Sequence, residues 1–157
     1  EGSGLDNLIL LRTLSKGYSL AGLRFGYGIA SNPDLIAAMD KARDSYNTDA
    51  LAQALACAAI GAHEEVSASW QKIKAERQRL TDALVQRGWS VLPSQTNFIL
   101  ATAPAGIDHA VRIYQTLKEN GIFVRYFNHP RLLDKLRITI GSPQQNDALI
   151  AALDNMN

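Results

Sequence analysis

Segments with strand-like and helix-like spacing alternate along the whole chain, and this alternation limits the folds that it can adopt. Apolar runs predict strands at 8–13, 26–30, 89–92, 97–101, 122–127 and 136–140. Apolar residues at helical spacing predict helices that begin at 33 and 143, and others at about 49–62, 66–87 and 108–120. Helices that alternate with strands indicate an α/β or α+β layer in which helices cover a face of a sheet.

Capping residues and glycines mark the ends of these helices. Asn32 can accept hydrogen bonds from the first backbone N–H groups of a helix, and Pro33 suits the first helical position because its missing N–H is not needed there. Gly88 is well placed to end the long helix in a left-handed conformation, and Gly121 closes the next one. We expect the boundary between two domains in the first turns of the long helix, near residue 66.

The composition is that of a globular protein, with 46% hydrophobic and 20% charged residues and a net charge of +1. No apolar run approaches the ~20 residues of a membrane span, and the basic residues form no run, so neither a membrane nor a nucleic-acid partner is expected. The single cysteine, Cys57, favours a reducing cytoplasm and is expected to be buried as a small hydrophobic residue. His63, His109 and His129 lack the spacing of metal ligands, so we expect no metal site.

The segment after the first expected strand carries the side chains best suited to chemistry. Lys16 follows the apolar run at 8–13, where a buried ammonium is costly unless it is used or paired. A desolvated lysine amine can attack a carbonyl carbon. The hydroxyls of Thr13 and Ser15 and the planar fork of Arg24 suit a phosphate group. Considered by themselves, these residues are also compatible with a surface turn that happens to contain a serine–lysine pair.

A longer run around this lysine resembles the cofactor-lysine signature of class I and II aminotransferases. The run consists of Ser15-Lys16, Ala21-Gly22-Leu23-Arg24 and Gly26, and its full length from Arg12 is closest to the histidinol-phosphate aminotransferase branch. The resemblance implies that pyridoxal 5′-phosphate is bound covalently by Lys16. It also implies that Ser15 and Arg24 hold the phosphate of the cofactor, with a further contact from Thr13.

Two later parts of the chain resemble the small domain of the same family. The strand that contains Asn97 matches in position, and so do the strands that contain Arg125 and Arg137. The resemblance implies that these residues bind the substrate, with both arginines on its anionic group. Considered without the resemblance, each arginine interrupts an apolar strand and needs an anionic partner. An ion pair with Asp134 or Asp147 is the alternative to substrate binding.

The resemblance implies the C-terminal part of a fold-type-I transferase. Residues 1–66 are then the end of the large cofactor-binding domain and its sheet, and residues 67–157 are the small α+β domain. The implied reaction is transamination between histidinol phosphate and 2-oxoglutarate in a cytoplasmic homodimer. The residues leave open another aminotransferase, such as one for aromatic amino acids, or a phosphothreonine-type decarboxylase.

A hypothesis from a different class is that the chain is a non-catalytic domain fragment that associates with another chain. The apolar run Leu8–Leu11 predicts a buried strand with neighbours on both sides, and few such neighbours are visible downstream. In the family, the residues on the ring of the cofactor precede the lysine strand, and this sequence holds none of them. We therefore expect a chain that is truncated upstream and inactive by itself, with unpaired apolar segments at 8–11 and 20–25 that favour association.

Overall fold

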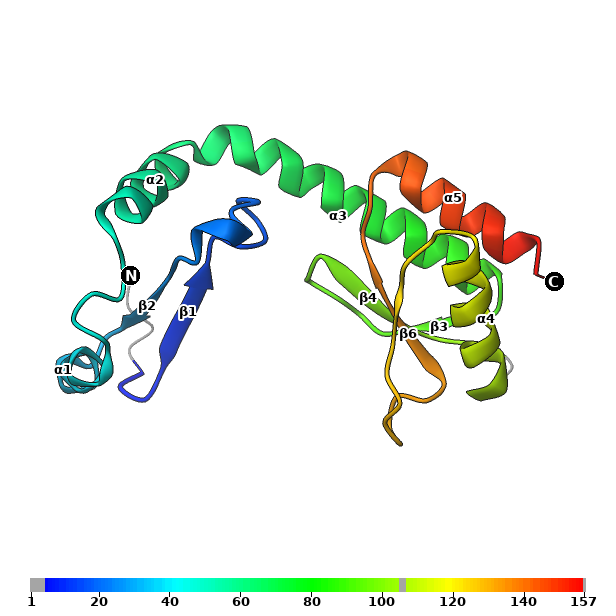
Figure 1. Ribbon diagram of the computed structural model, residues 1–157, viewed down its shortest axis with the longest axis horizontal. Helices are drawn as coiled ribbons and strands as arrows, with labels where there is room; N and C mark the ends of the chain where they lie inside the picture. The colour runs from blue at the N-terminus through cyan, green and yellow to red at the C-terminus, as the bar shows by residue number, and fades with distance from the viewer. Residues whose placement is uncertain (1–4, 105–106, 157) are drawn as a thin grey trace. The chain divides into compact units, whose positions relative to one another are not determined.

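The computed structural model describes residues 5–104 and 107–156. The chain divides into two compact units, Glu1–Ala68 and Ser69–Asn157, each with its own sheet. The division falls inside helix α3 (His63–Gln86), which is continuous (Figure 1). The boundary expected near residue 66 lies in the same helix. That the two parts belong to a large and a small domain stays a prediction.

The first unit is built on a hairpin of two antiparallel strands, β1 (Ile9–Thr13) and β2 (Gly26–Ala30). Thr13 pairs with Gly26 at the end where the hairpin opens into a loop. A Cβ atom on Gly26 would lie 2.8 Å from the carbonyl oxygen of Arg12, so this register has room only for glycine. The register therefore determines where the loop that carries Lys16 begins and ends.

Two capped helices complete the first unit. Helix α1 (Pro33–Ala42) begins as predicted, because the side chain of Asn32 accepts hydrogen bonds from two backbone N–H groups of its first turn. Helix α2 (Ala50–Gly61) begins at the cap residue Asp49, whose carboxylate accepts from the N–H of Ala52 at 2.7 Å. Both starts follow from local side chains and were predictable from the sequence.

Burial in the first unit differs from the prediction. Leu10, Leu11 and Ile29 are 50%, 72% and 54% exposed, so the strand expected to be buried lies open. Cys57 was expected to be buried and is also exposed. Two strands and two helices are too few elements to cover both faces of the hairpin and all sides of an apolar helix. The sequence patterns predicted the elements correctly, but burial depends on neighbours that the described residues of this unit do not supply.

The second unit is a four-stranded antiparallel sheet with helices on one face. The strand order is β3-β4-β6-β5, and the central pair is β4 (Phe98–Thr102) and β6 (Lys135–Thr139). The edge strands are β3 (Ser90–Val91) and β5 (Arg125–Tyr126), and the remaining helices are α4 (Ile107–Glu119) and α5 (Pro143–Asp154). Strand β5 is shorter than the predicted 122–127, because only its middle residues pair with β6.

Alternate residues of the central strands enter the core of the second unit. Leu136 and Ile138 of β6 are buried, together with Ile99 and Ala101 of β4. They pack in one cluster with apolar residues of the three helices, namely Leu80 and Leu84 of α3, Ala110, Ile113 and Leu117 of α4, and Leu149 and Leu153 of α5. Because strand side chains alternate between faces, Arg137 lies on the opposite face from Leu136 and Ile138.

A polar network joins α3 to the start of α5, just after the strand that carries Arg137. The side chain of Asn146 is buried and donates to Glu76 Oε2 at 2.8 Å and to the carbonyl of Gly141 at 3.2 Å. The guanidinium of Arg79, and then the amide of Asn146, hold the pKa of the Glu76 carboxyl below its ordinary value. This stabilisation is present above the ordinary pKa and is lost as the pH falls through the lowered one.

Candidate functional site

The loop between β1 and β2 is folded around one buried side chain. Leu14 is 1% exposed, its N–H donates to the carbonyl of Phe25, and its own carbonyl accepts from the N–H of Leu20 at 3.0 Å. A short 3-10 turn at Ala21–Leu23 then returns the chain to β2. These contacts fix the loop although most of its side chains face outward.

Lys16 lies in this loop with an exposed side chain. The N–H of Ser19 donates to the carbonyl of Lys16 at 2.9 Å, which forms a tight turn. The prediction of a desolvated lysine is wrong for this chain, because the hairpin beside it is itself uncovered. Ser19 and Arg24 adopt left-handed backbone conformations, with φ of 57° and 54°. Non-glycine residues in this region carry a strain of about 1–3 kcal/mol and cluster at ligand sites.

Three other residues were predicted to contact the cofactor. Ser15 and Arg24 lie on the same loop, and Thr13 is the last residue of the strand before it. The backbone N–H of Ser15 donates to Oγ1 of Thr13 at 3.1 Å, so these two residues are in direct contact. Arg24 donates from Nη1 to the carbonyl of Ala21 at 3.2 Å and makes no ion pair with a described carboxylate. Its exposed guanidinium therefore retains donors for an external anion.

This donor set fits the group that the resemblance implies. The amine of Lys16 is a nucleophile for an aldehyde, and the hydroxyl of Ser15 and the guanidinium of Arg24 are donors for a phosphate. Across residues 5–104 and 107–156, no three His, Cys, Asp or Glu side chains are grouped so that they could hold a metal ion. In the same ranges, no helix is long and apolar enough to cross a membrane.

The arginines predicted to bind substrate form a second cluster, on the open face of the second unit's sheet. Arg125 and Arg137 are directly opposite each other in the β5–β6 pair. Tyr126 turns the other way and packs against Tyr114 of α4, with ring centroids 5.8 Å apart. Two like charges that face each other across a strand pair are destabilising. The pair is therefore suited to an anion that bridges it.

Aromatic rings, not carboxylates, contact these two arginines. The guanidinium carbon of Arg137 lies 5.3 Å from the ring centroid of Phe98 and 5.7 Å from that of Phe127, and Arg125 lies 5.3 Å from Phe127. Contacts of this kind stabilise by about 0.5–2 kcal/mol each. Neither phenylalanine was predicted as a site residue, although the spacing of two residues between Arg125 and Phe127 places both on one face of a strand.

The alternative prediction, in which these arginines form ion pairs with Asp134 or Asp147, is wrong. Asp134 pairs with Lys135 at 2.6 Å, which lowers the pKa of that carboxyl, and Asp147 pairs with Arg79 at 2.6 Å. Neither predicted arginine forms an ion pair with any carboxylate in the described part of the chain. Asn97 is half-buried, and its carbonyl accepts from the N–H of Ile140 at 2.9 Å, which ties it to the end of β6.

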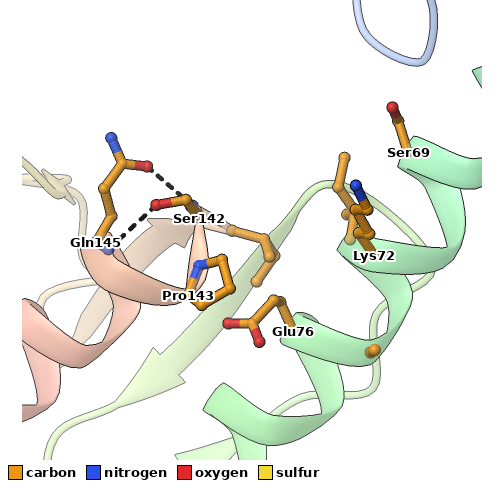
Figure 2. A pocket seen from close by; sticks show the side chains of 10 residues that line it. Ser69, Lys72, Glu76, Ser142, Pro143 and Gln145 are labelled. Atoms are coloured by element: carbon orange, nitrogen blue, oxygen red, sulfur yellow. Dashed lines mark hydrogen bonds between the residues drawn. The ribbon is translucent and has the colours of Figure 1, made fainter.

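A hollow of about 510 Å³ lies elsewhere on the second unit, between α3 and the start of α5. Figure 2 shows Lys72 and Glu76 of α3 near it, with the reciprocal hydrogen bonds of Ser142 and Gln145 at the opposite side. Most of its polar groups already have hydrogen-bond partners within the protein, since Ser142 and Gln145 cap α5 and Glu76 binds Arg79 and Asn146. None of the predicted site residues is among those that line it.

The part of the sequence that contains this loop and this sheet matches a known family of proteins. The sequence profile described as aminotransferase class I and II matches residues 2–153. The chain belongs to this family, whose members depend on pyridoxal phosphate.

Individual relatives carry more specific names. Histidinol-phosphate aminotransferase 1 of Nostoc sp. is 49% identical over 151 residues, which are 96% of this chain and 42% of that protein. Among solved structures, the histidinol-phosphate aminotransferase of Sinorhizobium meliloti in complex with pyridoxal-5′-phosphate is 33% identical, with a TM-score of 0.83 over 96% of this chain and 41% of that one. L-threonine-O-3-phosphate decarboxylase of Porphyromonas gingivalis is 27% identical, with a TM-score of 0.75 over 98% and 48%. The chain thus has the fold of part of a fold-type-I aminotransferase and spans less than half the length of these relatives.

Proposed function

We propose that this chain supplies the lysine-bearing part of a pyridoxal-phosphate-dependent aminotransferase that acts on histidinol phosphate and 2-oxoglutarate. The observation that carries the proposal is the β1–β2 loop, which contains Lys16, Ser15 and Arg24 and ends at Gly26. The relatives named histidinol-phosphate aminotransferase support histidinol phosphate as the amino donor. Because the chain spans 42% of the length of the Nostoc relative, we propose that it is inactive by itself.

The residues of the loop divide the work between anchoring and proton transfer. The cofactor, when bound, supplies an electron sink for the carbon from which a proton is removed. Lys16 would hold the cofactor through Nζ, and its free amine would move a proton at that same atom. Ser15 and Arg24 would hold the phosphate, with a further contact from Thr13, which would anchor the cofactor at this loop.

Arg125 and Arg137 hold the anionic group of the substrate, and Asn97 contacts the substrate beside them. This assignment is supported by the lack of an ion pair between either guanidinium and a described carboxylate. The N–H groups of both arginines therefore stay available to an anion. Arginine presents parallel N–H groups that match phosphate and carboxylate oxygens. The same pair therefore accepts the phosphate of one substrate and a carboxylate of the other in turn.

Replacing Arg137 tests this assignment. In an active protein that contains this chain, Arg137→Ala should raise KM about ten- to hundredfold for both substrates, because charge-assisted hydrogen bonds to the anion are lost. Steady-state kinetics with each substrate varied in turn measures the effect. Arg131→Ala, which removes an exposed arginine from the loop before β6, is the control and should leave both values unchanged. An unchanged KM for both substrates in Arg137→Ala would exclude Arg137 from binding.

Other amino donors are the nearest alternative. An aromatic amino acid as donor, or decarboxylation of a phosphothreonine-type substrate, would use the same lysine and the same anion-binding arginines. The fold shared with the decarboxylase of Porphyromonas gingivalis is compatible with the second of these. Measuring amino transfer from the first two donors and CO2 release from the third, each as kcat/KM, ranks the three substrates.

We further propose that the intact protein is a cytoplasmic homodimer and that, in this chain, the open face of β1 favours association with a second copy. The supporting observations are the single, exposed cysteine and the exposed leucines of β1, since uncovered apolar strands favour pairing. The same surface supports the second candidate function, a non-catalytic association module. Light scattering of the chain should give the mass of a dimer, and Leu11→Lys should shift it toward a monomer. The matched control is Leu92→Lys, on an exposed leucine of the other unit. A monomer at high concentration would count against the association module.

A further inference from the structure

Phe127 is the only described residue whose ring contacts the guanidinium groups of both arginines. Its ring centroid lies 5.3 Å from the guanidinium carbon of Arg125 and 5.7 Å from that of Arg137. Phe98 contacts Arg137 alone, at 5.3 Å. Arg137 is therefore held by two rings from different strands, whereas Arg125 relies on the shared one.

The rings matter because these arginines have no other described partner that orients their side chains. Neither guanidinium donates a hydrogen bond or forms an ion pair within the described ranges, and the two positive groups repel each other across the β5–β6 pair. An exposed arginine without partners samples many rotamers, and that freedom is lost when it binds an anion. A flat ring within cation–π distance restricts the guanidinium before binding.

We propose that Phe127 is a positioning residue that aligns Arg125 and Arg137 as one anion-binding pair, with Phe98 as a second support for Arg137. This inference rests on the proposed function, because it assumes that the pair binds the anionic group of the substrate. An aromatic ring suits the task better than a carboxylate. A carboxylate would occupy the N–H groups and compete with the substrate, whereas a ring contacts the face of the guanidinium and leaves the N–H groups at its edge free.

Anion titration of the 157-residue chain tests the proposal without any enzymatic assay. The probe is inorganic phosphate, and the readout is the NMR signals of the Nε–Hε groups of Arg125 and Arg137. In the wild type, phosphate should shift both signals together. In Phe127→Leu the Kd for phosphate should rise about fivefold, because one cation–π contact is lost at each arginine. Phe98→Leu should raise the Kd less than Phe127→Leu does, because Arg137 then keeps the ring of Phe127 and Arg125 loses no contact.

Matched variants separate positioning from a general loss of structure. Phe127→Tyr retains the face of the ring and should restore the Kd to within about twofold, a rescue that lost packing would not predict. Phe123→Leu makes the same change at a phenylalanine that is 78% exposed and contacts neither arginine, so it should have no effect. If the backbone NMR spectrum of Phe127→Leu differs from that of the wild type, the variant is misfolded. Phe98→Leu then tests whether ring contacts to Arg137 strengthen phosphate binding.

The outcomes distinguish the two proposals. If phosphate shifts neither arginine signal in the wild type, anion binding by the pair fails, and the proposed function loses its substrate site. If phosphate binds and Phe127→Leu binds it as tightly as the wild type, the positioning role is overturned while the proposed function stands. A Kd that rises in both Phe127→Leu and Phe127→Tyr also overturns it, because the ring face is then not what matters.

Discussion

Incubation of this chain with pyridoxal phosphate, followed by borohydride reduction, should leave one modified lysine, Lys16. Lys16 is the lysine that shares a short loop with Ser15 and Arg24, whose donors can hold the phosphate while the amine reacts. The loop raises the local concentration of the aldehyde at this amine over that at other lysines. Intact mass should show a single adduct, peptide mapping should place it on Lys16, and Lys16→Ala should abolish it.

The control for this experiment is a lysine outside the loop. Lys118→Ala removes an exposed lysine in the last turn of α4 and should leave the adduct intact. Arg24→Ala should lower the extent of labelling at Lys16, since the phosphate then loses its charged partner. Labelling scattered over several lysines, or none at all, would contradict the prediction. The cofactor-binding role proposed for Lys16 in this chain would then be dropped, and its membership of the family would be unaffected.

Leu136→Ala should lower the free energy of unfolding of the second unit by about 2–5 kcal/mol, the range for removing a buried leucine side chain. Leu136 is fully buried in β6, paired with Ala101 on one side and Tyr126 on the other. The strand that it anchors also carries Arg137. Urea unfolding followed by circular dichroism measures the change from the shift in the midpoint.

An exposed leucine on the same unit provides the comparison for that measurement. Leu92 is 52% exposed, and Leu92→Ala should change the free energy of unfolding by no more than about 0.5 kcal/mol. Equal losses in the two variants would show that the β6 strand is not part of the cooperative core. The core of the second unit would then have to be centred on its helices.

Local features of this fold were predictable from the sequence, and features that depend on distant neighbours were not. The starts of α1 and α5 follow from Asn32, Pro33, Ser142 and Pro143, and the structure places both helices there. The extent of β5 was predicted too long, because pairing with β6 and not apolar composition limits it. The prediction that β1 is buried was wrong for the same kind of reason. The spacing of apolar residues predicts which face of a strand tends to be buried, but not whether another element lies against that face.

The candidate site shows the same division between local and long-range information. The lysine loop could be recognised because its residues lie within one short run of sequence. The ring contacts of Arg137 could not, because Phe98 and Phe127 are brought to it by the registers of two strand pairs. The chemical roles of Lys16 and of both arginines stay predictions, which the labelling and titration experiments address.

The close approach at Gly26 links the architecture of the hairpin to the chemistry of its loop. The carbonyl oxygen of Arg12 occupies the space of a side chain at position 26, so even a methyl group there would force the two strands apart or out of step. A slip of one position would change the length of the loop and turn Thr13 to the opposite face of the hairpin. The same close approach therefore constrains both the pairing of the two strands and the placement of Lys16, Ser15 and Arg24. A library of variants that holds these three residues fixed but randomises position 26 should contain few chains that keep the register of the hairpin.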